Sequence, residues 1–483
     1  WGTAGNWEQN VLPAETDNVI VPNLVVLTLN GDRTINDVAI ATGGEIVVGD
    51  DEFTINGASD IDGTITISTG TVDVDGVFDA TGGFVTFTGA GNLMLSSTVT
   101  GLGTLSGNGT VTYDNVGHQT IVAYTYYSLT AGGTEGTKTL SGIVNVDGDL
   151  TIDSGVTIAM GANNLTVAGA TTIPGTVTIS TATLDANGAF NATGGNVTFT
   201  GAGNLTLSST VEDLGTLSTN FGKVTYDGTV QTIFLDTYYD LTAGNANIKT
   251  LGGDVVVSRD LTIDAGVTLD VSSNDYSINV ARNFANSGTF TMQDGLVTFD
   301  GNDDQTLTSG GSSFYAITFN NGGGSGKKLI IDGALTLANN LTITAGTLDL
   351  DTNDPNISIA GDLAIADGAV WTKGSGTATF AGGTQSLSDG NTTPNDLGGA
   401  LINSTQMTVT TDATFTSLQI SLGGKNILNT GNTLAITGAL TIAGELEMAD
   451  SSVVDAGGDV TVAAAGTLDM DGTSRLKMEG DLS

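Results

Sequence analysis

Cysteine is absent from the 483 residues, and histidine occurs once, as His118. The chain therefore forms no disulfide and binds no metal through cysteine. A Ser-His-Asp arrangement would have to use His118, in Val116-Gly-His-Gln119, while the matching segment Thr229-Val-Gln231 has no histidine. We interpret His118 as a surface residue of a turn and predict that the protein is not an enzyme.

Positive charge and long apolar runs are also scarce. There are 12 Lys+Arg against 52 Asp+Glu, a formal net charge of −40. Such a surface repels phosphate backbones and anionic lipid, so nucleic acid and membrane surfaces are poor candidate partners. No run of about 18 apolar residues is present, which predicts no membrane span. The chain opens on Trp1 without a signal peptide, as expected of a processed chain or an excised fragment. The Gly/Thr/Asn/Asp-rich, Lys-poor composition favours an extracellular or cell-surface location.

The sequence contains one long segment twice. Residues 63–106 align with residues 175–218 at a constant offset (175 − 63 = 112), and 33 of the 44 positions are identical. Apolar and hydroxyl residues alternate within both copies, the period of a strand with one buried face. With only 5 prolines and no convincing 3.6-residue apolar period, the sequence predicts an all-β stacked repeat protein.

The differences between the two copies predict which side chains point inward. Aliphatic residues replace each other in four pairs, which we expect to be inward-facing: Ile65/Val177, Val72/Leu184, Val74/Ala186 and Val77/Ala189. Polarity changes in three pairs, which we expect to face water: Phe84/Asn196, Met94/Thr206 and Thr100/Glu212.

Shared landmarks, such as Gln-Thr-Ile at 119–121 and 231–233 and Gln-Thr-Leu at 305–307, extend the repeat along the chain. The step between Val224 and Val297 is 73 residues (297 − 224), and the shortfall of 39 (112 − 73) equals two coils of about 20 residues. The predicted segments are an N-terminal cap at 1–23, entering coils at 24–62, and repeat units at 63–174, 175–285, 286–375 and 376–483, the last with an open C-terminal end.

These features predict a single elongated parallel β-helix, or β-solenoid, of about 22 coils, right-handed because that sense dominates parallel crossovers. A string of small antiparallel sandwiches is the alternative. Since the chain stops in mid-coil after Gly480-Asp-Leu482, we expect either a longer protein or an end covered by another subunit, and head-to-tail stacking would then build a filament.

Acidic residues offer one candidate metal site. Asp349-Leu-Asp351-Thr-Asn353 has the 1,3,5 spacing of a calcium loop, followed by Asp354. Position 6 of an EF-hand would be Gly and position 12 Glu, whereas Asp354 and Ala360 stand there, so this is no EF-hand. We predict that Asp349, Asp351, Asn353 and Asp354 could bind a stabilising Ca²⁺; the alternative is that Asp begins a turn. No cofactor is required.

Two further patterns bear on carbohydrate. Carboxylate pairs such as Asp73/Asp75 and Asp147/Asp149 would be needed for glycoside hydrolysis, but a solvated acidic face explains them as well. The aromatic pairs Tyr126-Tyr127, Tyr238-Tyr239 and Phe314-Tyr315 recur at matching places. We favour aromatic packing inside the coils over a sugar-binding platform.

The landmark series Val297-Thr-Phe-Asp-Gly301, Gln305-Thr-Leu307 and Gly333-Ala-Leu-Thr-Leu337, with the Trp1…Trp7…Pro13…Pro22 opening, resembles the filamentous-haemagglutinin-like and autotransporter-like β-solenoid surface proteins of bacteria. The resemblance covers nearly the whole chain and implies display at the cell surface. We expect a structural fibre, stalk, sheath or surface-layer component that self-associates head-to-tail or laterally or contacts other surface components. The alternatives are an adhesin that binds glycans and a carbohydrate-active β-helix enzyme.

Overall fold

The computed structural model describes residues 1–218 and 220–483 and is built almost entirely of β-strands. The single helix in these residues is the 3₁₀ turn η1 (Ala4–Asn6). The chain divides into two compact units, Trp1–Gly228 and Thr229–Ser483, and each is described by itself. No helix in the described part has the length and apolar character needed to cross a bilayer.

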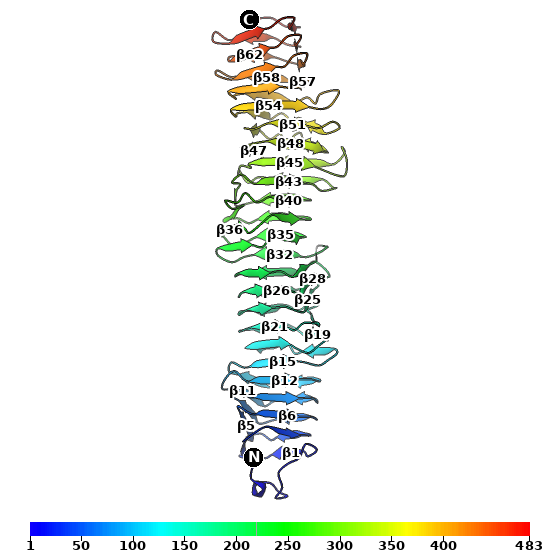
Figure 1. The fold of residues 1–483 in the computed structure, drawn as a ribbon, viewed down its shortest axis with the longest axis vertical. Helices are drawn as coiled ribbons and strands as arrows, with labels where there is room; N and C mark the ends of the chain where they lie inside the picture. The colour runs from blue at the N-terminus through cyan, green and yellow to red at the C-terminus, as the bar shows by residue number, and fades with distance from the viewer. Residues whose placement is uncertain (219) are drawn as a thin grey trace. The chain divides into compact units, whose positions relative to one another are not determined.

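Both units are parallel β-solenoids. In the first unit, a turn consists of β8 (Thr64–Ile67), β9 (Thr71–Val74) and β10 (Phe78–Asp79), and the next consists of β11 (Phe84–Phe87), β12 (Asn92–Leu95) and β13 (Val99–Gly101). Each strand pairs in parallel with the third strand after it, so that successive strands of a sheet lie one above another (Figure 1). Thr64 pairs with Phe84, and Phe84 with Thr104, a step of 20 residues (84 − 64 and 104 − 84).

The turns of the two units amount to about 23, close to the predicted 22. All strand pairs found among the described residues are parallel, which confirms the β-solenoid and shows that the antiparallel-sandwich alternative is wrong. The right-handed sense and the repeat boundaries given above stay predictions.

One sheet runs through nearly the whole first unit, whereas the other two faces are interrupted. Its strands are β3 (Arg33–Ile35), β6 (Glu52–Ile55), β9, β12, β15 (Thr110–Tyr113), β18 (Ser128–Ala131), β21 (Leu150–Ile152), β24 (Thr171–Thr172), β27 (Phe190–Asn191) and β30 (Val211–Asp213). The sheets on the other faces end at β13 and at β14 (Thr104–Ser106). New sheets begin at β16 (Gln119–Ile121) and β17 (Thr125–Tyr126). We call this interruption the seam.

Turns of the second unit vary in their number of strands. Its longest sheet includes β40 (Ile278–Val280), β43 (Leu296–Phe299), β45 (Ala316–Asn320), β48 (Leu341–Ala345), β51 (Leu363–Ile365), β54 (Thr384–Asp389) and β56 (Gln406–Val409). From β43 to β45 and from β54 to β56 the strand number rises by two instead of three. These turns replace a strand by a loop with one isolated bridge, Phe314 to Leu337 and Asp396 to Thr414. Loss of single strands is tolerated because each turn contacts only its neighbours.

Alternate residues of the strands form the core, as the sequence predicts. In β8, Ile65 and Ile67 are fully buried, while Thr64 and Thr66 are half-buried. Six of the eight residues predicted to face inward are buried, namely Ile65, Val177, Val72, Leu184, Val74 and Ala186. The prediction is wrong for the fourth pair: Val77 is exposed and Ala189 half-buried. Val77 lies at a corner between strands, where alternation is lost, and Phe78 occupies the inward position instead.

The first turn is covered by aromatic residues. The Trp1 ring is buried and lies 5.6 Å from the ring of Phe53 and 5.0 Å from that of Trp7. The Trp1 ammonium group donates a hydrogen bond to the Thr28 carbonyl at 2.9 Å. These contacts shield Phe53, an inward-facing residue of β6, from water.

Candidate functional site

The four residues predicted to bind calcium lie at the end of β49 (Thr347–Asp349) and in the turn after it. Asp349 is buried, and its Oδ1 accepts hydrogen bonds from the backbone N–H groups of Asp351 and Thr352, both at 3.0 Å. Its Oδ2 accepts from the Thr352 hydroxyl at 3.0 Å and from Nζ of Lys328 at 2.6 Å. Asp349 thus stabilises the tight turn that follows β49, and it forms an ion pair with a lysine in the preceding turn of the solenoid. Burial opposes ionisation of Asp349, but the bonds from Lys328 and Thr352 outweigh it and hold the pKa of this carboxyl below its usual range.

The other three predicted ligands are not drawn together by a shared contact. The Asn353 amide donates to the Ile331 carbonyl at 3.3 Å, and Asp354 Oδ1 accepts from the Ser375 N–H at 2.5 Å. Asp351 is exposed. Within the described residues, no group of three or more His, Cys, Asp or Glu side chains is placed to hold a metal ion. Calcium binding by these residues stays a prediction. The ion pair with Lys328, in β46 (Lys328–Asp332), was missed because it joins neighbouring turns rather than neighbouring residues.

A second candidate region is the seam. Strand β14 pairs only with β11, and β17 pairs only with β20 (Val144–Val146). The hydroxyl group of Tyr124 bridges the interruption: it accepts a hydrogen bond from the Leu105 N–H and donates one to the Gly103 carbonyl, both at 3.0 Å. One side chain thus satisfies two backbone groups that strand pairing would otherwise satisfy. Two hollows lie along the seam.

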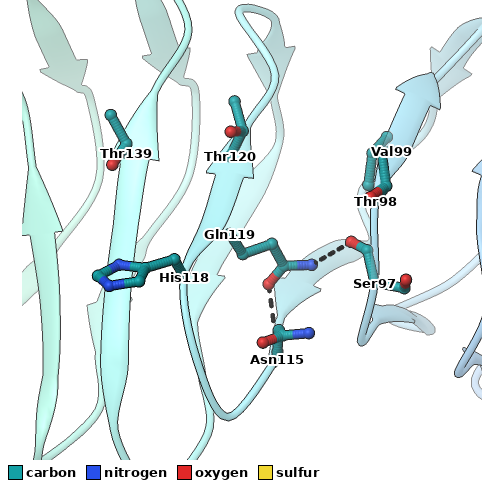
Figure 2. Close-up of a pocket in the computed structure, with 8 residues that line it drawn as sticks. All are labelled: Ser97, Thr98, Val99, Asn115, His118, Gln119, Thr120 and Thr139. Carbon is teal, nitrogen blue, oxygen red and sulfur yellow. Dashed lines mark hydrogen bonds between the residues drawn. The ribbon is translucent and has the colours of Figure 1, made fainter.

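The first hollow, of about 250 Å³, contains the only histidine. Ser97 and His118 both line it, and Figure 2 shows the Gln119 side chain between them. The Gln119 amide donates to the Ser97 carbonyl at 2.8 Å and accepts from the Asn115 N–H at 3.2 Å (Figure 2). His118 is exposed, and no Asp or Glu lines the hollow. The side chains therefore do not form the Ser-His-Asp arrangement considered from the sequence.

An acidic cluster occupies the outer face of the continuous sheet. Burial, together with the neighbouring charges of Asp75, Asp114 and Glu52, raises the pKa of Asp73 to about 6. Oδ1 of Asp73 is buried without a hydrogen-bond partner. The equivalent residue of the second copy, Asp185, has its pKa raised chiefly by burial as well. Ionised Asp73 therefore destabilises the fold.

We expect Asp73→Asn to stabilise the protein at neutral pH. The folded-state pKa of about 6 exceeds the ordinary value of 3.8, so wild-type stability falls as pH rises through this window. After allowance for solvent screening, the variant should gain about 1 kcal/mol at pH 7.5, and the gain should vanish below about pH 4. Urea denaturation at both pH values measures this. Asp60→Asn, at an exposed position, should change stability by less than about 0.5 kcal/mol at either pH. An equal gain at both pH values would contradict the assigned pKa.

The recurring aromatic pairs divide between core and surface. Tyr126, Tyr238 and Phe314 are fully buried, which confirms aromatic packing inside the coils. Tyr113 and Tyr126 join their hydroxyl groups at 2.9 Å, and burial raises the pKa of Tyr113 to about 12. The second members are not fully buried: 42% of Tyr127 is exposed, and Tyr239 and Tyr315 are half-buried. Tyr127 lines the second hollow of the seam.

Comparison with protein-family models, with curated proteins and with solved structures gives no significant match. The parallel β-solenoid is therefore established by the structure alone. The resemblance to bacterial surface proteins rests on the sequence landmarks.

Proposed function

We propose that this protein is a non-enzymatic extracellular structural component, a β-solenoid that serves as a fibre, stalk, sheath or surface-layer element of a bacterium. The observation that carries the proposal is the parallel stacking of turns in both units. Each turn leaves its inward-facing residues to be covered by its neighbours, so length is gained by adding turns without any change of design. The resemblance to filamentous-haemagglutinin-like and autotransporter-like proteins supports the same role.

The outward-facing residues suit an extracellular setting. The net charge of −40 is carried on side chains between the buried ones, together with many Thr, Ser and Asn residues. Such a surface remains soluble and resists non-specific association with other acidic surfaces. The absence of cysteine makes the fold independent of the redox state of its surroundings.

Self-association belongs to the proposal, and strand edges are where it would take place. Strands β65 (Thr467–Met470) and β66 (Arg475–Met478) pair on one side only, with β62 (Glu445–Met448) and β63 (Val453–Ala456). Leu468 and Leu476 continue the inward rows of Leu446 and Val454, which are fully buried, but are themselves half-buried. Any further turn stacked on these strands, from the same protein or from a second copy, would bury these leucines and extend the sheets.

Electron microscopy and light scattering test this role together. We expect negative-stain images of the purified chain at rising concentration to contain assemblies longer than one chain. The double variant Leu468→Lys, Leu476→Lys should remain monomeric in light scattering while keeping its circular dichroism spectrum. Monomeric wild-type protein up to about 100 μM, a concentration at which a micromolar contact would be saturated, would end the self-association part. Turnover of soluble polysaccharides by the purified chain would end the structural role as a whole.

A further inference from the structure

We propose that the second hollow of the seam binds a neutral oligosaccharide. This goes beyond the structural role and does not depend on self-association. The hollow has a volume of about 530 Å³ and is lined by two tyrosines of the seam, Tyr124 and Tyr127, and by Ser106, Asn108, Thr125 and Asp147. Its size falls within the range of sites for small ligands.

The hollow exists because the strands on either side of it do not pair. β14 ends one sheet and β17 begins another. The Tyr124 hydroxyl group forms hydrogen bonds with the backbone at Leu105 and Gly103. It thereby fixes β14, which has no partner strand on this side. The ring of Tyr124 in turn lies 5.9 Å from that of the fully buried Tyr126. The wall formed by Tyr124 is therefore anchored in the core on one side and in the backbone on the other.

Tyr127 provides an uncovered aromatic ring at this site. One turn later stands Gly148, and a Cβ atom placed there would lie only 3.3 Å from Cε1 of Tyr127. Because glycine has no such atom, the chain leaves the ring open, and 42% of the residue is exposed. The exposed face of this tyrosine offers apolar surface on which a ligand can pack, and its hydroxyl group offers a polar contact beside it.

In the second copy of the repeat, an arginine covers the equivalent tyrosine ring. Tyr239 corresponds to Tyr127, and Arg259 corresponds to Gly148, in the aligned segments Gly148-Asp-Leu150 and Arg259-Asp-Leu261. The guanidinium carbon of Arg259 lies 5.5 Å from the centre of the Tyr239 ring, and Arg259 forms ion pairs with Asp240 and Asp260 at 3.3 and 3.2 Å. One sequence thus contains an open tyrosine and a covered one on the same scaffold.

The lining selects the chemistry of the ligand. A pyranose ring has an apolar C–H face, which packs on an aromatic ring, and hydroxyl groups at its edge, which need short polar partners. Ser106, Asn108 and Thr125 offer donors and acceptors, and Asp147 accepts hydrogen bonds from hydroxyl groups. The carboxylate of Asp147, within a chain of net charge −40, repels anionic sugars. The hollow therefore favours uncharged hexose units over uronic acids.

Titration calorimetry of the whole chain with maltohexaose, cellohexaose and hexa-N-acetylchitohexaose, and with hexagalacturonate as the anionic counterpart, tests the proposal. We expect at least one neutral hexasaccharide to bind with a Kd of about 1 mM or below and hexagalacturonate to bind at least about tenfold more weakly. Tyr127→Ala should weaken the neutral ligand about tenfold. Tyr239→Ala, the matched control, should leave its affinity unchanged.

A second variant introduces the covering arginine of the second repeat into the first. Gly148→Arg should abolish binding by placing a side chain against Tyr127. A Cβ at this position would also lie 2.9 Å from the Tyr127 carbonyl oxygen, which can disturb the fold. Circular dichroism therefore checks that Gly148→Arg is folded. If it is not, the result for Tyr127→Ala alone decides whether the proposal holds. The proposal is overturned if none of the three neutral hexasaccharides binds at about 5 mM, or if Tyr127→Ala binds as tightly as the wild type.

Discussion

Phe314→Ala is expected to lower the free energy of unfolding by about 3–5 kcal/mol, the usual cost of removing a fully buried phenylalanine. Phe314 lies in a loop where a turn of the second unit lacks one strand, and it is anchored there by a single bridge to Leu337. Its ring centre lies 5.2 Å from that of Phe284 and 5.0 Å from that of Phe290. Alanine would leave a cavity between two turns that no other strand can fill.

Urea denaturation followed by circular dichroism measures the effect. Phe84→Ala is a suitable control, because the same side chain is 49% exposed on an outward face, and it should cost less than about 1 kcal/mol. Equal losses for the two variants would mean that the three-ring cluster contributes nothing beyond an ordinary surface contact. A repeat protein can also unfold locally, so a separate early transition in Phe314→Ala would place the loss in the second unit.

The fold could be predicted because the sequence states the same pattern many times. The exchange of Ile65 for Val177 and of Val72 for Leu184 identifies inward positions without any structure, and both pairs are buried. A step of about 20 residues follows from the missing 39 and agrees with the pairing of Thr64 with Phe84. Period-2 alternation and a long repeat leave few architectures other than a stack of parallel turns.

Corners and contacts between turns could not be predicted in the same way. Val77 looks like a strand residue, yet it stands at a corner where Phe78 takes the inward place. The calcium prediction for Asp349 uses only its neighbours along the chain, from which the ion pair with Lys328, 21 residues earlier, could not be predicted. The residues that decide such a site lie one turn away, and the length of a turn varies too much for their partners to be counted off in advance.

The second hollow of the seam, where we propose that a saccharide binds, illustrates the same limit. The recurrence of Tyr127 and Tyr239 is visible in the sequence, and so is their aromatic character. Tyr127 is uncovered because Gly148 stands one turn later, and Tyr239 is covered because Arg259 stands there. Neither Gly148 nor Arg259 belongs to the aromatic motif. Only the register of the stacked turns brings these residues together.

Buried glutamines, among them those of the Gln-Thr-Ile and Gln-Thr-Leu landmarks, have a structural role that the sequence did not reveal. Gln119, Gln231, Gln305 and Gln385 are all buried. The Gln385 amide donates to the carbonyls of Ile359 and Gly361, at 2.9 and 2.6 Å, and accepts from the Gly382 N–H at 3.0 Å. Gln119 and Gln305 likewise donate to carbonyls of the preceding turn. The side chains of Gln119, Gln305 and Gln385 thus bond backbone carbonyls at the ends of strands in the preceding turn.

Gln385→Leu should therefore cost about 2 kcal/mol, because it fills the same space but leaves the Gly361 carbonyl and the Gly382 N–H group without the partner that Gln385 provides, while the Ile359 carbonyl keeps its bond from the Ala381 N–H group. Gln385→Glu should cost more at pH 7, since its carboxylate would face the carbonyls of Ile359 and Gly361. Burial would raise the pKa of the introduced glutamate, so that this variant regains stability as pH falls toward 4, where the protonated acid can donate. Urea denaturation at both pH values measures the difference.

Gln419→Leu, on the exposed side of β58 (Ser417–Ile420), is the control and should change stability by less than about 0.5 kcal/mol. If Gln385→Leu were equally mild, the buried amides would be fillers of space, and the backbone groups they contact would have to be satisfied by water.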